Sequence, residues 1–120
     1  MHGQGTIKYA DGRNVSGTFT EGHLYGVGKF VSPSGYEYEG EFNFDQKDGN
    51  GIYKWPNGKR YEGKFKADLK DGEGTLYFPD GRIYEGIFDN DKPIGLGKKK
   101  YPDGRVLELE FKDGKYVVKQ

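Results

Sequence analysis

The sequence predicts an all-β repeat protein: an open, twisted, antiparallel β-meander of about five hairpins, or ten strands, in a single-layer sheet. Two observations carry this prediction. Gly-x-Gly recurs every 23 residues, and aromatic residues alternate with polar ones on both sides of a glycine turn in each copy. The pairs begin at Gly3, Gly26, Gly49, Gly72 and Gly95. A period of about 20 to 50 residues indicates one supersecondary unit stacked on its copies.

Composition supports a folded chain whose core is built from rings. Of the 120 residues only 32% are hydrophobic, but 16% are aromatic and 21 residues are glycine. Disordered chains are poor in aromatic residues and lack a strict period, so disorder is rejected. The 19 basic and 19 acidic residues cancel. A neutral chain has no field that attracts polyanions, so we expect no nucleic-acid partner.

The sequence also bears on the compartment. The chain has no cysteine, which excludes disulfides and thiolate metal sites. No apolar run approaches the roughly 18 residues of a membrane span, and no signal peptide opens the chain. We therefore expect a cytoplasmic protein, with a peripheral position at a membrane or the cytoskeleton as the alternatives.

Each repeat reads as one β-hairpin within a single domain, residues 1–120. Proline followed by Asn-Gly or Asp-Gly between two aromatic runs is typical of a hairpin turn. The turns lie at residues 11–12, 34–35, 57–58, 80–81 and 103–104. The expected hairpins span residues 3–20, 26–43, 49–66, 72–89 and 95–112, followed by a C-terminal cap at 113–120. Short polar connections should keep successive hairpins side by side.

Parity decides the length of each hairpin loop. A two-residue loop at 57–58 would put the rings of the two strands on opposite faces. A three-residue loop at 56–58, a type I turn with a glycine bulge, pairs Tyr53 with Tyr61 and Gly51 with Gly63. One face then carries rings and glycines, and the other carries charged side chains: Glu39, Glu41, Glu62, Lys64 and Glu85. Each glycine leaves a hollow into which a ring of the adjacent strand can lie.

The pattern changes at both ends. The next Gly-x-Gly would fall at Val118 and Gln120. Where the three middle copies have Tyr-Glu-Gly, the last copy has Leu-Glu-Leu at 107–109 and the first has Val-Ser-Gly at 15–17. Terminal repeats depart from consensus because they cap an exposed edge. At the other end, Met1 directly precedes the motif His2-Gly3-Gln4-Gly5, with no cap. This start fits an open edge strand or a chain cut from a longer one, and both alternatives stay open.

The repeat resembles a known family. Over nearly the whole chain the repeat looks like membrane occupation and recognition nexus (MORN) repeats. The motifs that carry this resemblance are Tyr38-Glu39-Gly40-Glu41-Phe42 with its copies at Tyr61 and Tyr84, Asp71-Gly72-Glu73-Gly74 and Pro79-Asp80-Gly81. The resemblance implies a non-catalytic intracellular β module that serves as a scaffold, dimerises or binds partner proteins; phospholipid binding is also attributed to the family. Such modules often accompany a catalytic domain, so a regulatory module cut from a larger enzyme is another reading.

The residues offer no catalytic, metal or cofactor site. Gly26-Val27-Gly28 has no third glycine and opens no helix, so it does not predict a nucleotide site. The acidic loops at 45–48 and 68–71 lack the alternating carboxylates of a calcium loop, and two lone histidines do not make a zinc site. No serine or cysteine nucleophile accompanies a base. We therefore expect a protein that is not an enzyme.

Two binding surfaces remain as hypotheses. A single-layer sheet cannot hide its ring face beneath a second layer, and exposed apolar patches mark interaction sites. We expect this face to form a groove for a partner peptide, a helix or a second copy of the sheet, unless the glycine hollows take in the rings completely. The predicted groove residues are Tyr38, Tyr53, Trp55, Tyr61, Phe78 and Tyr84.

The alternative is a basic surface for anionic phospholipids such as phosphoinositides. Its residues are Lys92, Lys98, Lys100 and Arg105. Clusters of about 4 to 8 basic residues bind such lipids. Alternation places Lys98 and Lys100 on the polar face and the neighbouring Lys99 on the ring face, which divides the cluster. Lysines that protect an edge strand explain the pattern equally well.

Overall fold

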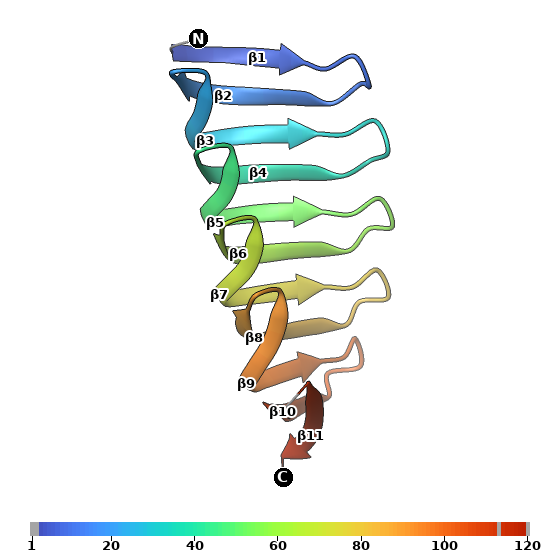
Figure 1. Ribbon diagram of the computed structural model, residues 1–120. Coiled ribbons are helices and arrows are strands. Elements are labelled where there is room, and N and C mark those ends of the chain that lie inside the picture. Colours follow the sequence, from blue (N-terminus) through green and yellow to red (C-terminus); the bar gives the residue numbers. More distant parts are fainter. Residues whose placement is uncertain (1–2, 113, 120) are drawn as a thin grey trace.

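A computed structural model describes residues 3–112 and 114–119. It is one open antiparallel sheet whose strands follow sequence order, so every strand pairs with its neighbours in the chain (Figure 1). The molecule measures 54 × 24 × 20 Å, as a single layer of stacked strands requires. The predicted meander is confirmed. The described residues contain no helix long and apolar enough to cross a membrane.

The described residues form eleven strands, one more than the predicted ten. The strands are β1 (Gly3–Lys8), β2 (Asn14–Thr20), β3 (His23–Val31), β4 (Glu37–Asn43), β5 (Gln46–Lys54), β6 (Arg60–Lys66), β7 (Leu69–Tyr77), β8 (Ile83–Asp89), β9 (Lys92–Lys100), β10 (Val106–Lys112) and β11 (Lys115–Lys119). The additional strand, β11, comes from the segment expected to cap the sheet. It pairs with β10 through Phe111 opposite Tyr116 and Leu109 opposite Val118. Residues 113 and 120 of that segment lie outside the described residues.

The hairpin loops have the predicted length and register. Tyr53 lies opposite Tyr61 and Gly51 opposite Gly63. The Trp55 amide donates to the Lys59 carbonyl at 2.9 Å, and the Gly58 amide donates to the Trp55 carbonyl at 3.1 Å. Gly58 has φ +95°, the left-handed conformation that the glycine bulge requires. The three residues at 56–58 therefore form the loop.

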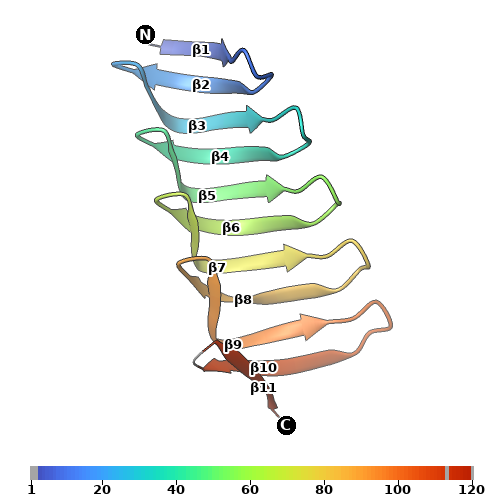
Figure 2. The ribbon, with the colours of Figure 1, turned by 45° about the vertical axis from the view of Figure 1, so that its right-hand side comes forward.

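The connections between hairpins are tighter than the sequence indicates. Lys66 pairs with Leu69, so only Ala67 and Asp68 form the loop, and both have positive φ, 49° and 72°. This is the geometry of a type I′ turn, the two-residue turn whose twist matches the flanking strands. As a result β3, β5, β7 and β9 begin three residues earlier than the predicted hairpins. These turns line one long edge of the sheet (Figure 2).

A bulge bends each strand pair next to these turns. Between β6 and β7 the pairing changes from Gly63 opposite Gly74 to Phe65 opposite Lys70, so Lys64 faces three residues of β7. Extra residues on one strand bend it and strengthen its twist. The start of each following strand consequently curls out of the plane of the sheet (Figure 1). The curled segments stand beside the ring face and give the sheet a raised rim there.

Three of these turns begin with a residue that their conformation disfavours: Glu21, Phe44 and Ala67 have φ of 52°, 49° and 49°. Ala67 has φ 49°, where only glycine, asparagine and aspartate are readily accepted. We expect Ala67→Asn to raise the free energy of unfolding by roughly 0.5 to 1 kcal/mol, measured by urea denaturation. Asn90 has φ 48° at the equivalent turn position, so the control Asn90→Ala should lower stability by a similar amount. A destabilising Ala67→Asn would contradict the assigned turn.

The core is a row of aromatic rings that lie against the ring face of the sheet. Tyr38, Tyr61 and Tyr84 lie over glycines of the following strand, where a Cβ at Gly51, Gly74 or Gly97 would overlap the phenol. Each tyrosine meets two phenylalanines edge to face; Tyr61 contacts Phe65 at 5.1 Å and Phe88 at 5.3 Å between ring centroids. Edge-to-face pairs are the favoured arrangement of aromatic rings. Rings and glycines therefore form one continuous core.

Candidate partner-binding groove

A groove runs along the ring face between the core and the raised rim. Two hollows, of about 440 and 240 Å³, share Lys47, Tyr53 and Asp68 in their linings. The first continues toward β1 past Phe30 and Ile7, and the second continues past Trp55 toward Asp91. Together they make one channel across successive hairpins, which we call the ring-face groove.

The structure divides the six predicted groove residues into two sets. Tyr38, Tyr61 and Tyr84 are only 1%, 0% and 6% exposed, so the expectation that they would remain accessible is wrong. The cause is the glycine column of the next strand, which receives each phenol. Tyr53, Trp55 and Phe78 are partly buried: they pack against the core and keep part of each ring open. The anchors available to a partner are therefore these last three rings.

The buried phenols are uncharged parts of the core. Burial raises the pKa of Tyr61 to about 12, and burial also raises the pKa of Tyr38, Tyr53 and Tyr84. The Tyr38 hydroxyl donates to the Glu41 carbonyl at 2.8 Å and that of Tyr61 to the Lys64 carbonyl at 3.0 Å. These carbonyls belong to the bulge residues, so Tyr38 and Tyr61 each also fix the adjacent bulge.

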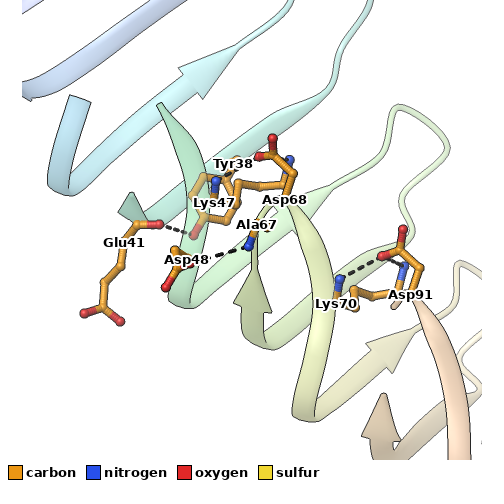
Figure 3. Close-up of polar contacts among 8 residues, drawn as sticks. All are labelled: Tyr38, Glu41, Lys47, Asp48, Ala67, Asp68, Lys70 and Asp91. Atoms are coloured by element: carbon orange, nitrogen blue, oxygen red, sulfur yellow. Dashed lines mark hydrogen bonds and ion pairs between the residues drawn. The ribbon is translucent and has the colours of Figure 1, made fainter. Parts of the chain in front are cut away.

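Paired charges line the rim of the groove. Figure 3 shows the Lys47 amide and ammonium directed at Asp68, and those of Lys70 directed at Asp91 one repeat later. The amides donate to the carboxylates at 2.8 and 2.7 Å, and the ammonium distances are 3.3 and 3.5 Å. In return the Asp68 amide donates to the Lys47 carbonyl at 2.9 Å. Each turn is thereby attached to the strand of the preceding repeat.

The same lysines lie over the aromatic rings. The Lys47 ammonium is 5.4 Å from the Tyr53 ring centroid, and that of Lys70 is 5.7 Å from the Trp55 ring centroid. Lys59 lies closer still, 4.7 Å from Trp55, and 5.6 Å from Phe78. Burial, and secondarily the charge of Lys70, lowers the pKa of Lys59. Two cations, Lys59 and Lys70, thus converge on Trp55.

Sequence reasoning missed these lysines because it searched for a basic cluster along one stretch of chain. Lys47 and Lys70 follow the repeat at a spacing of 23, and they occupy the position at which Leu24 fills the first turn of the series. An alignment of the repeats shows lysine in two copies at the position where an earlier copy has a core leucine. This substitution is the sequence signal that could have revealed the charged rim.

The predicted lipid-binding residues do not form one surface. Lys92 begins β9 at the turn edge, whereas Arg105 lies in the hairpin loop at the other edge. Arg105 pairs with Asp103 at 2.8 Å, and Lys100 pairs with Glu85 at 2.9 Å on the polar face. Lys98, opposite Glu85 in the ladder, lies on that same face. Lipid binding by this set stays an untested prediction.

The repeats of this chain match the sequence model of a known family. The MORN repeat model matches residues 1–12, 38–60, 61–81 and 84–104. The chain belongs to the MORN repeat family. Three of the matched segments start at or next to the buried tyrosine of β4, β6 or β8 and run through the turn into the next strand. Each of these three units therefore contains a core tyrosine together with the glycine hollow that receives it.

MORN repeats are typically non-catalytic and suggest a scaffold or binding role. No curated protein matches the sequence of this MORN chain. Among solved structures, the chain is similar to the SAS-4 (dCPAP) TCP domain, solved in complex with a proline-rich motif of Ana2 (dSTIL) of Drosophila melanogaster. The two are 18% identical with a TM-score of 0.50, over 98% of this chain and 83% of that one. At this identity the likeness concerns the fold of the sheet.

Proposed function

We propose that this MORN protein is a non-catalytic scaffold that binds a segment of a protein partner in the ring-face groove. The observation that carries the proposal is the row of half-open rings, Tyr53, Trp55 and Phe78, beside a rim of charged side chains. Large aromatic side chains bordered by polar groups are the usual anchors of protein interfaces. The groove is long and shallow, which suits an extended segment or a helix.

Two further observations support this proposal. The MORN family suggests a scaffold or binding role. The solved sheet of similar fold, the TCP domain, was captured with a proline-rich motif of another protein. The core tyrosines hold the floor of the groove rigid, so a partner would meet a preformed surface and lose less free energy to ordering it.

Two adjacent residues on opposite faces allow a direct test. Tyr77 is the last residue of β7 and Phe78 follows it directly, so their side chains alternate between the polar face and the ring face. A photo-reactive phenylalanine analogue would replace either residue, and the protein would be irradiated in an extract of the cells that make it. We expect a specific crosslinked polypeptide, identified by mass spectrometry, from position 78 and not from position 77.

The matched control keeps the photo-reactive group and removes an anchor. Trp55→Ala should abolish the crosslink from position 78, whereas truncation of a polar-face side chain, Ile52→Ala, should leave it unchanged. Ile52 lies opposite Glu62 on the polar face of the same hairpin. A crosslink to a second copy of the chain would identify self-association through the groove. Equal crosslinking from both faces would refute the proposal.

A further inference from the structure

We propose that the segment bound in the ring-face groove is proline-rich, adopts the polyproline II conformation along the long axis of the sheet, and places an acidic side chain against Lys59. This inference rests on the proposed function and names the chemistry of its ligand. Its basis is a row of rings that repeats with the hairpins, together with one cation in that row whose carboxylate partner is missing.

The row consists of the last ring-face residue before each hairpin loop. We call it the ring ladder: Tyr9, Trp55, Phe78 and Tyr101, with Ser32 at the second position. A cation from the far side of the loop lies over each ring, with centroid distances of 4.5, 4.7, 5.3 and 4.5 Å for Arg13, Lys59, Arg82 and Arg105. From Trp55 to Tyr101 the ladder is uninterrupted across three successive hairpins; Tyr9 and Trp55 line the ring-face groove, and Phe78 and Tyr101 continue the row beyond it.

The spacing of the ladder matches one conformation of a bound chain. Successive hairpins lie two strands apart, about 9.6 Å. A polyproline II helix has three residues per turn and rises about 3.1 Å per residue, so every third residue recurs after about 9.3 Å. A Pro-x-x-Pro-x-x-Pro segment perpendicular to the strands would therefore present a proline to each ring, with a mismatch of about 0.6 Å over three rings. Aromatic grooves are the usual receptors of such segments.

Other backbone conformations fit this period less well. Two turns of an α-helix, seven residues, advance about 10.5 Å, so the offset from the rings grows to about 1.8 Å by the third one. In an extended strand, side chains on one face recur every 6.6 to 6.8 Å, roughly, which falls between the rings. The ladder thus selects polyproline II among the regular conformations.

Charge complementarity indicates where the bound segment carries its acidic residue. In three loops the cation over the ring pairs with an aspartate of its own turn: Arg13 with Asp11, Arg82 with Asp80 and Arg105 with Asp103, at 2.8, 2.7 and 2.8 Å. In the third hairpin Asn57 occupies the aspartate position, and its side-chain oxygen accepts from the Lys59 amide at 2.9 Å. Within residues 3–112 and 114–119, the Lys59 ammonium therefore has no ion pair.

The surroundings of Lys59 leave that charge for a ligand. Lys70, whose ammonium also lies over Trp55, is already paired with Asp91. The ladder near Trp55 thus carries one uncompensated positive charge between two rings, whereas the flanking turns are neutral. A carboxylate beside the proline that contacts Trp55 would neutralise it, and charge-assisted contacts of this kind fix the register of a bound chain.

A peptide-selection experiment tests the inference on the intact protein. Two phage-displayed libraries of twelve residues would be selected in parallel: one with proline at every third position and the rest randomised, and one with alanine at those positions. We expect enrichment only from the proline library, with aspartate or glutamate dominant at one randomised position. Trp55 is the single tryptophan of the chain, so its fluorescence reports whether a selected peptide occupies the ladder.

A charge exchange provides the decisive comparison. The selected acidic peptide should bind the Lys59→Glu variant at least tenfold more weakly than the unchanged protein. The same peptide with lysine in place of its acidic residue should bind that variant with the lost affinity restored. Against Asn57→Asp, which supplies the missing carboxylate, affinity should fall as well. Enrichment of the alanine library, or no acidic preference, would overturn the inference and leave the groove as a binding site. If Trp55→Ala alters neither selection, both the inference and the proposed function fail.

Discussion

The Tyr61→Ala variant is expected to lose about 3 to 5 kcal/mol of unfolding free energy, the range measured when a large buried ring is removed from a core. Tyr61 is fully buried, contacts Phe65 and Phe88 edge to face, and fills the hollow above Gly74. A single-layer sheet has no second layer that could collapse into the cavity. Urea denaturation followed by circular dichroism measures the loss.

Two conservative variants separate the ring from its hydroxyl. Tyr61→Phe removes the hydrogen bond to the Lys64 carbonyl and should cost about 1 kcal/mol. Tyr84→Phe should be neutral or slightly stabilising, because the buried Tyr84 hydroxyl has no partner among the described residues. If Tyr61→Ala were as mild as Tyr61→Phe, the ring would not be part of the core.

Gly74→Ala is expected to destabilise the protein by about 3 kcal/mol, at the upper end of the cost of overpacking. A Cβ at this position would overlap the Tyr61 phenol. The backbone of Gly74 is not in the left-handed region, so alanine meets no conformational penalty there and the whole effect comes from the displaced ring. Thermal and urea unfolding measure the loss.

A second glycine isolates the conformational effect. Gly104 has φ +94° and open space around its Cα, so Gly104→Ala should cost only about 1 to 2 kcal/mol through backbone strain. The double variant Gly74→Ala with Tyr61→Ala should be more stable than the sum of its parts predicts, because the added methyl then enters the space left by the ring. Additive losses would show that the glycine and the ring do not share one site.

The fold follows from sequence because its determinants are local and repeated. Parity around Asn57-Gly58 gave the pairing of Tyr53 with Tyr61, and that pairing is present in the structure. The turns at 67–68 were not predictable in this way, since Ala67 is a residue that propensity rules place elsewhere. Its conformation is imposed by the strands on both sides and by the attachment of Asp68 to Lys47.

The site was less predictable, because exposure depends on direction as well as on face. Tyr53 and Tyr61 are the same residue type, on the same face and directly opposite, but only Tyr61 is completely buried. Tyr61 leans toward the glycines of the following strand, and Tyr53 has no such hollow beside it. The alternation of residues in the sequence shows on which face a side chain lies, but not toward which neighbouring strand it points. The charge on Lys59 likewise became informative only once its neighbours were known.

The strictly sequential order of the strands also determines how the protein would respond to tension. β1 and β11 occupy the two ends of the sheet, so a pull between them acts along the hydrogen bonds that join neighbouring strands. Bonds loaded along their axis open one after another instead of resisting together in shear. Each repeat that opened would release 23 residues, about 80 Å of extended chain, while the remaining repeats kept their shape. The molecule would therefore lengthen in equal steps under a small force.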